Sequence, residues 1–169
     1  MISLKRIILL LVISLAGFFL VQGGIDLWLN GRMRAHWEAA EKRIATALFA
    51  ADHPAIVAAG RSFLQRHPGQ TLRLDPGTAG WEELPAALRQ LQPDAVLREK
   101  DRLRIEFAVG GVEQGLAIYA EDREQPEADE LLLQPGLFFY YDPFDDPPNP
   151  RKAYQYLRAK YPPGKEARP

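Results

Sequence analysis

The acidic stretch near the C-terminus holds the densest set of side chains able to do acid–base chemistry. Asp142, Asp145 and Asp146 fall within five consecutive residues. General acid–base catalysis needs two carboxylates in different environments, and an EF-hand calcium loop needs alternating oxygen ligands, a central glycine and a distal glutamate. The prolines around the stretch favour a turn over either site. A hydrolase using these carboxylates with Arg102 or Arg104 on a saccharide or peptide is therefore kept as an alternative function.

Other residues that could bind metals or attack substrates are too scattered to form a recognisable site. The chain has no cysteine, and its histidines and serines lack the spacing of metal-binding helices and nucleophile motifs. The glycine pair at residues 110–111 lacks the lysine and the strand-to-helix context of a phosphate-binding loop. We therefore predict no catalytic residue, no metal ligand and no cofactor. The histidines are His36, His53 and His67, and the serines are Ser3, Ser14 and Ser62.

Aromatic residues are concentrated between residues 137 and 161. Strand-like alternation places Phe138 and Tyr140 on one face, and their neighbours Leu137, Phe139 and Tyr141 on the other. Because the preceding helices can cover only one face, we expect one of these two sets to be core and the other to lie under a terminal helix or to form a partner surface. Exposed tyrosines near arginines are typical of binding hot spots. Tyrosines that pack under a helix with the hydroxyl at its edge are ordinary core residues, which is the alternative. The candidate partner surface comprises Phe138, Tyr140, Tyr141, Phe144, Tyr154 and Tyr156.

An uncharged N-terminal segment, residues 7–25, is long enough to anchor the chain in a membrane. Lys5 and Arg6 precede it, and its nineteen residues carry no charge. At about 1.5 Å per helical residue they span about 28 Å, close to the ~30 Å hydrocarbon core. A cleaved secretory signal is the alternative, because export machinery also reads basic residues followed by an apolar stretch. We expect a retained single-pass helix in contact with the lipid bilayer.

The charges around this segment also bear on its orientation. Basic residues flank both ends, so the positive-inside rule gives no clear direction. The short basic N-terminus and Asp26 after the segment favour an N-terminus inside and a C-terminal domain outside. We therefore expect a bacterial inner membrane protein with a periplasmic domain. The formal net charge of -1 argues against nucleic-acid binding.

Two amphipathic helices are predicted after the anchor. Apolar residues recur every three or four positions over residues 33–51. We expect this helix to pack on its own domain, with a weak homodimer or another protein contact through residues 33–51 as the alternative. The second helix begins at His53 and Pro54, where proline suits the first turn, and ends at His67. Its apolar stripe is Ile56, Val57, Gly60, Phe63 and Leu64.

An antiparallel sheet is predicted for the second half of the chain. Apolar and charged residues alternate along residues 102–109, which indicates a strand with one buried face. The glycine pair that follows permits a tight turn, so residues 112–120 should return as a hairpin. Further strands are predicted at residues 71–74, 130–134 and 137–142, the last two extending the sheet as a meander. A short terminal helix is expected at residues 151–160.

The predicted fold is α+β, with an N-terminal transmembrane helix, two amphipathic helices packed on three to five antiparallel strands, and a short C-terminal helix. Residues 1–25 form the anchor, residues 26–161 a single soluble domain, and residues 162–169 a flexible basic tail. Because the sequence shows no recognisable set of catalytic residues, we expect a non-enzymatic, membrane-anchored envelope protein. Its extracytoplasmic domain would bind a protein or cell-wall partner. A small immunity or inhibitor protein is a further alternative to the hydrolase.

Overall fold

The computed structural model describes residues 31–109, 112–143 and 146–163. The chain divides into two compact units, Met1–Glu38 and Ala39–Pro169. The predicted anchor at residues 7–25, the glycine pair at residues 110–111 and most of the predicted tail lie outside the described residues. Within the described ranges, no helix combines the length and the apolar character needed to cross a bilayer. The membrane anchor therefore stays a prediction.

The first helix covers residues 31–49. Part of its apolar stripe is buried in the core of the second unit, so this helix packs on its own domain, as expected. Met33 and Trp37 are 47% and 40% exposed, and a homodimer contact through residues 33–51 stays a prediction. The buried apolar residues of this helix in the second unit are Ala40, Ile44, Ala45, Ala47 and Leu48.

Helix α2, His53–Arg66, has a first turn that contains Pro54. The Asp52 side chain accepts a hydrogen bond from the Ala55 amide at 3.1 Å, which satisfies a free N–H of the first turn. The stripe predicted for this helix is confirmed, because all five of its members are buried. They are Ile56, Val57, Gly60, Phe63 and Leu64.

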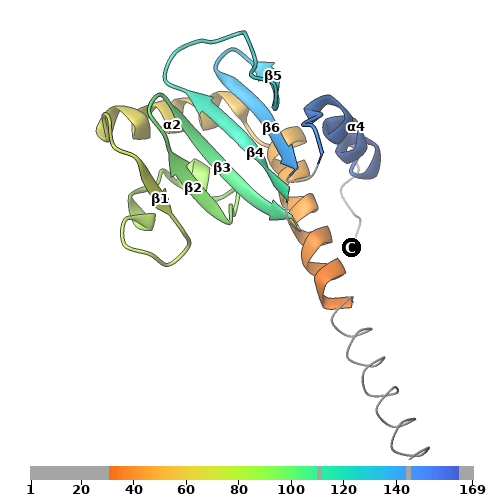
Figure 1. The fold of residues 1–169 in the computed structure, drawn as a ribbon. Helices are drawn as coiled ribbons and strands as arrows, with labels where there is room; N and C mark the ends of the chain where they lie inside the picture. Colours follow the sequence, from red (N-terminus) through yellow and green to blue (C-terminus); the bar gives the residue numbers. More distant parts are fainter. Residues whose placement is uncertain (1–30, 110–111, 144–145, 164–169) are drawn as a thin grey trace, which may run out of the picture. The chain divides into compact units, whose positions relative to one another are not determined.

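The strands form one antiparallel sheet in the order β1-β2-β3-β4-β6-β5 (Figure 1). A 3-10 helix, Trp81–Glu83, and helix α3, Ala86–Arg89, precede β2, while helix α4, Pro150–Lys160, follows β6. Over the described residues this is an α+β fold with four α-helices and six strands, which confirms the predicted class. The strands are β1 (Leu72–Leu74), β2 (Ala95–Arg98), β3 (Arg102–Val109), β4 (Val112–Tyr119), β5 (Glu130–Gln134) and β6 (Leu137–Pro143).

Two features of the sheet differ from the prediction. The sheet has six strands rather than three to five, because Ala95–Arg98 forms a separate strand paired with both β1 and β3. The last strands do not form a meander, since β4 pairs with β6 and β5 lies at the edge. Burial explains this order. β6 buries Leu137 to Tyr140 on both faces, whereas Leu132 of β5 is 38% exposed. A strand that is apolar on both faces gains more from an interior position.

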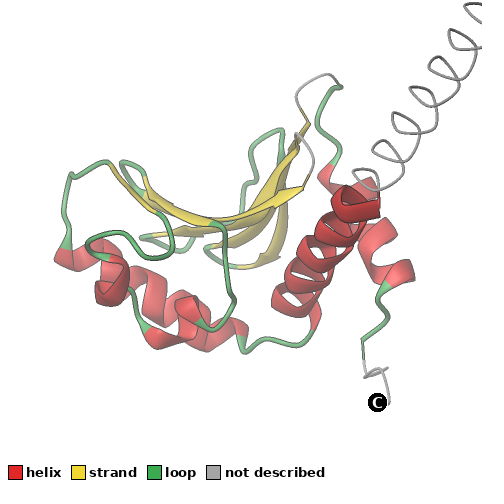
Figure 2. Cartoon of the chain, turned by 90° about the horizontal axis from the view of Figure 1, so that it is seen from below, coloured by secondary structure: helices red, strands yellow, loops and turns green. Residues whose placement is uncertain are grey.

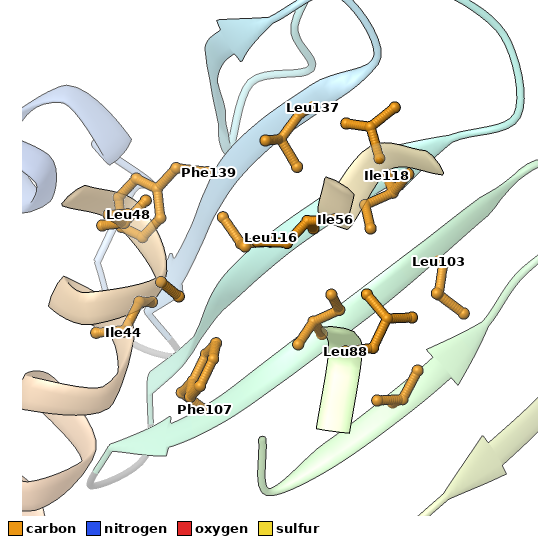
Figure 3. Close-up of a cluster of buried hydrophobic side chains, with 14 of the residues drawn as sticks. Ile44, Leu48, Ile56, Leu88, Leu103, Phe107, Leu116, Ile118, Leu137 and Phe139 are labelled. Atoms are coloured by element: carbon orange, nitrogen blue, oxygen red, sulfur yellow. The ribbon is translucent and has the colours of Figure 1, made fainter. Parts of the chain in front are cut away.

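The main core lies between one face of the curved sheet and the helices (Figure 2). Leu103, Ile105 and Phe107 of β3 point into it, which confirms the predicted alternation. Figure 3 shows Leu103 and Phe107 in one cluster with Leu88 of α3 and with Ile44 and Leu48 of the helix over residues 31–49. A second, smaller cluster lies on the opposite face of the sheet. Its members are Ala117, Tyr119, Phe138 and Tyr140.

Gly115 allows unusually close packing at the centre of the sheet. A Cβ atom at this position would lie 1.8 Å from the Ile105 carbonyl oxygen and 3.0 Å from the Tyr140 ring. Backbone atoms cannot move aside as a flexible side chain can, so only glycine fits here. The Tyr140 ring occupies the space beside Gly115 on the helix-free face.

Helix α4 lies on the same side of the sheet as the other helices. Leu157 is buried in the main core, and the Tyr154 ring packs edge-on against Phe49 with their centroids 5.2 Å apart. The set outside the main core is Phe138 and Tyr140, and the expectation that the terminal helix covers the set outside the core is therefore wrong. Those two rings are buried by neighbouring side chains of their own face.

Candidate functional site

A cavity of about 600 Å³ opens where β4, β6, α4 and the helix over residues 31–49 approach one another. This volume lies within the range of small-molecule and peptide pockets. The walls combine apolar and aromatic side chains with a few polar groups. The lining residues are Glu41, Val112, Gln114, Tyr141, Pro143, Asp146, Pro147, Asn149, Lys152, Ala153, Tyr156 and Leu157.

The wall formed by α4 is positioned by local sequence signals. Asn149 precedes the helix, and its side-chain oxygen accepts a hydrogen bond from the Lys152 amide at 2.9 Å. Pro150 follows in the first turn, where its missing N–H has no cost. Leu157 is only 2% exposed and fixes the inner face of the helix against the core. The cap and the buried leucine together set which side chains of α4 reach the cavity.

Glu41 joins the end of α4 to the first helix. Its carboxylate accepts hydrogen bonds from Lys160 Nζ at 2.6 Å and from the hydroxyls of Tyr156 and Tyr161, each at 3.2 Å. The bonds from Lys160 to Glu41 and Tyr156 hold the pKa of the Lys160 ammonium above its ordinary value. The acceptor capacity of Glu41 is therefore largely used within the protein.

Gln114 is the most deeply buried polar side chain of the cavity, at 5% exposure. It lies in β4, opposite Phe107 of β3 and Tyr141 of β6. Its amide group makes no side-chain hydrogen bond with any described residue, and it belongs to the cavity lining. Among the described residues, its amide atoms are not fully buried without a partner, so they open onto the cavity, where water or a ligand can hydrogen-bond them.

A second group of polar side chains lies on the helix-free face of the sheet, around Arg104. The guanidinium carbon lies 4.2 Å from the centroid of the Tyr140 ring, and Nη2 donates to Glu113 at 3.0 Å. Glu106, at 3.9 Å from Arg104, also accepts a bond from Arg73 at 3.4 Å. Burial raises the pKa of Glu106, against the opposing effect of Arg104. Burial likewise raises the pKa of the Tyr140 hydroxyl, which has no hydrogen-bond partner among the described residues.

The neighbouring part of this face is also ion-paired. Arg102 donates to Glu127 at 3.0 Å, to Glu130 at 3.3 Å and to the Tyr119 hydroxyl at 3.1 Å. Tyr119 in turn donates to Glu130 at 2.8 Å. Because the guanidinium groups are already bound to carboxylates, we interpret this face as a structural polar layer over the aromatic cluster.

The candidate partner surface is divided among three environments. Phe138 and Tyr140 are 0% and 1% exposed and lie on the helix-free face. Tyr141 and Tyr156 both line the cavity, whereas Tyr154 packs between Phe49 and Phe139. Phe144 lies outside the described residues. Among the described members, Tyr141 and Tyr156 meet at the cavity, while Phe138 and Tyr140 share the buried cluster of the helix-free face.

The remaining candidates for chemistry are dispersed. Asp146 lines the cavity and Asp142 is exposed at the end of β6, while Asp145 is not among the described residues. Arg102 and Arg104 bind glutamates instead of these aspartates. His53 contacts the Ala47 carbonyl at 3.1 Å and His67 packs on Phe63, so both belong to helix ends. No group of three potential metal ligands occurs in the described part of the chain.

Sequence reasoning missed four polar residues of the cavity: Glu41, Gln114, Asn149 and Lys152. One signal was available, since Gln114 shares the inward-facing phase of Leu116 and Ile118 in β4. A polar residue in that phase is unexpected in a core strand. Comparisons with protein-family models, with curated proteins and with solved structures give no match to this chain. Function is therefore argued from the cavity.

Proposed function

We propose that this protein is a membrane-anchored, non-enzymatic envelope protein whose C-terminal domain binds a protein or cell-wall partner through the cavity. Residues 7–25 would hold it in a bacterial inner membrane, with the domain in the periplasm. Tethering keeps such a domain near partners in the same envelope, which raises their effective concentration.

The lining of the cavity is the observation that carries this proposal, because aromatic and proline side chains surround the Gln114 side chain. The Gln114 amide opens onto this space and can donate to or accept from a bound partner. The tyrosines and prolines beside it resemble the aromatic anchors and apolar walls of recognition sites. No nucleophile paired with a base lines the cavity among the described residues, so binding fits these side chains better than catalysis.

Filling the cavity tests this proposal. Ala153 lines it, and Ala153→Trp would place an indole ring in the binding space. We expect affinity isolation from solubilised membranes to lose the partner recovered with the unmodified chain, while circular dichroism shows a folded domain. Ala159→Trp is the matched control, because Ala159 is exposed on the same helix. Undiminished partner recovery with folded Ala153→Trp would contradict binding at this cavity.

The hydrolase is retained as a second candidate because Asp146 reaches the cavity. Asparagine at positions 142, 145 and 146 keeps the size and much of the hydrogen bonding of each side chain but removes acid–base function. A hydrolase should lose its cellular phenotype with these substitutions, whereas a binding protein should keep it. Loss of phenotype in a folded triple variant would favour the enzyme.

A further inference from the structure

The start of the first helix carries large apolar side chains that are exposed to solvent. Met33 and Trp37 are 47% and 40% exposed, and residues four apart lie on the same side of a helix. The apolar residues that follow on this helix, from Ala40 to Leu48, are buried. The exposed pair therefore lies at the end of the helix that is nearer in sequence to the predicted anchor at residues 7–25.

Basic side chains flank this apolar pair. Arg32 and Arg34 are exposed on either side of Met33, each about 100° around the helix from it. Against these two charges the exposed stretch carries one carboxylate, that of Glu38, which lies about 140° from Met33. An apolar stripe flanked by basic residues is the pattern of helices that lie in the headgroup layer of a membrane.

The chain between the predicted span and this helix is short. Residues 26–30 separate Ile25 from Gly31, where the described part of the helix begins. The distance from Ile25 to Gly31 is about 9 Å for a helix and about 20 Å for an extended chain, while each headgroup layer is about 5–8 Å thick. An Asn-Gly pair favours a turn, so a helix that starts at Gly31 can lie along the membrane surface.

A second copy of the chain suits this surface less well. A coiled coil needs apolar residues over three to four heptads, and the rest of this stripe is already buried within the same chain. Two side chains one turn apart also bury far less than the about 1,200–2,000 Å² of a stable protein interface. A lipid contact needs no such area, because the predicted span already supplies the attachment.

We propose that the exposed side of residues 32–37 binds the headgroup layer of the bilayer. Met33 and Trp37 pack at the edge of the acyl chains, where the amphipathic indole ring is favoured. Arg32 and Arg34 extend their apolar stems along the surface and bind lipid phosphates. This inference rests on the proposed membrane anchor and adds a second lipid contact, which fixes the side of the helix that faces the membrane.

Spin labels at single cysteines test this contact, since the chain has no cysteine of its own. Met33→Cys and Trp37→Cys would each be labelled in the full chain, held in nanodiscs of phosphatidylethanolamine and phosphatidylglycerol. Ala35→Cys is the matched control, because Ala35 is exposed on the opposite side of the same turn. We expect a higher ratio of oxygen to water-soluble nickel accessibility at positions 33 and 37 than at position 35, because oxygen concentrates in apolar lipid.

The phosphate contact is tested in the same measurement. Arg34→Glu, added to labelled Met33→Cys, should lower the ratio at position 33, because a carboxylate is repelled by lipid phosphates. Arg34→Lys keeps the charge and should preserve the ratio. A ratio that Arg34→Glu leaves unchanged would overturn the arginine contact.

The outcomes separate failure of this inference from failure of the anchor. Equal ratios at positions 33, 35 and 37, in discs that retain the chain, overturn the surface contact and leave the anchor standing. Labels at positions 33 and 37 that are shielded from both reagents, with dipolar broadening between copies, identify a second copy at this surface and also overturn it. A chain that does not co-purify with the discs overturns the anchor and the inference together. Met33 and Trp37 are not buried, so circular dichroism should show the same fold in each variant.

Discussion

Buried polar residues take two different forms on the two faces of this sheet. On the helix-free face, Arg104 contacts Glu113, Glu106 and the Tyr140 ring, so most of its interactions are satisfied internally. In the cavity, Gln114 is 5% exposed and makes no side-chain hydrogen bond with the described residues, but its amide opens onto the space. The ion pairs of the helix-free face are thus made within the fold, whereas the Gln114 amide can bind water or a partner.

Glu106→Gln should stabilise the fold at neutral pH. Burial raises the pKa of Glu106 above its ordinary value of 4.5, so the folded state binds its proton more readily than the unfolded state. Stability attributable to this group therefore falls as pH rises from that value upward. Glutamine carries no charge and avoids the loss. Denaturation of both proteins by urea, between about pH 4.5 and about pH 8, should show an advantage for the variant that shrinks as the pH falls.

Glu124→Gln provides the matched control, because Glu124 is exposed on the loop after β4. Its unfolding curve should remain parallel to that of wild type over the same pH range. A Glu106→Gln variant that is less stable than wild type at neutral pH would show that the ion pairs with Arg73 and Arg104 outweigh the cost of burial.

At the scale of elements, α4 is an integral part of the domain as well as a wall of the cavity. Leu157→Ala should cost about 2–5 kcal/mol of unfolding free energy, because this side chain is 2% exposed in the main core. Arg158→Ala, at the next and exposed position, should change stability by less than about 0.5 kcal/mol. Chemical denaturation followed by circular dichroism measures both. Equal, small effects would mean that α4 is only loosely attached.

Elements defined by local signals could be predicted from the sequence. The helix start at His53 and Pro54, the alternation along residues 102–109 and the strand at residues 130–134 all agree with the structure. The pairing of β4 with β6 could not be predicted. The sequence of the acidic loop over residues 121–129 does not show whether β5 or β6 pairs with β4. Long-range order is decided by total burial, which local periodicity does not report.

The cavity could not be predicted from the sequence for the same reason. Glu41, Gln114 and Tyr156 come from three elements far apart in the sequence, and only the tertiary fold brings them together. The aromatic density between residues 137 and 161 indicated the segment that supplies Tyr141 and Tyr156 to the cavity. It did not distinguish Tyr141 and Tyr156, which line the cavity, from Phe138 and Tyr140, which are buried on the other face. Aromatic composition identifies a segment but not its exposure.

At the scale of the whole molecule, the proposed function requires retention in a membrane. The chain should remain in the pellet after alkaline carbonate washing, because residues 7–25 are predicted to span the hydrocarbon core. A periplasm-dependent reporter enzyme fused after residue 163 should be active. A soluble species that begins near residue 24 would instead identify the segment as a cleaved signal and contradict the tethered arrangement.

Site-specific crosslinking in intact cells tests partner binding at the cavity most directly. A photoreactive amino acid at Lys152 would lie in the cavity wall, and the same residue at Lys100 would lie exposed in the turn between β2 and β3. We expect one defined crosslinked product from position 152, absent from position 100 and lost when Ala153→Trp is added. Products of equal yield from both positions, or a product from position 152 that persists in the filled cavity, would contradict partner binding at this site.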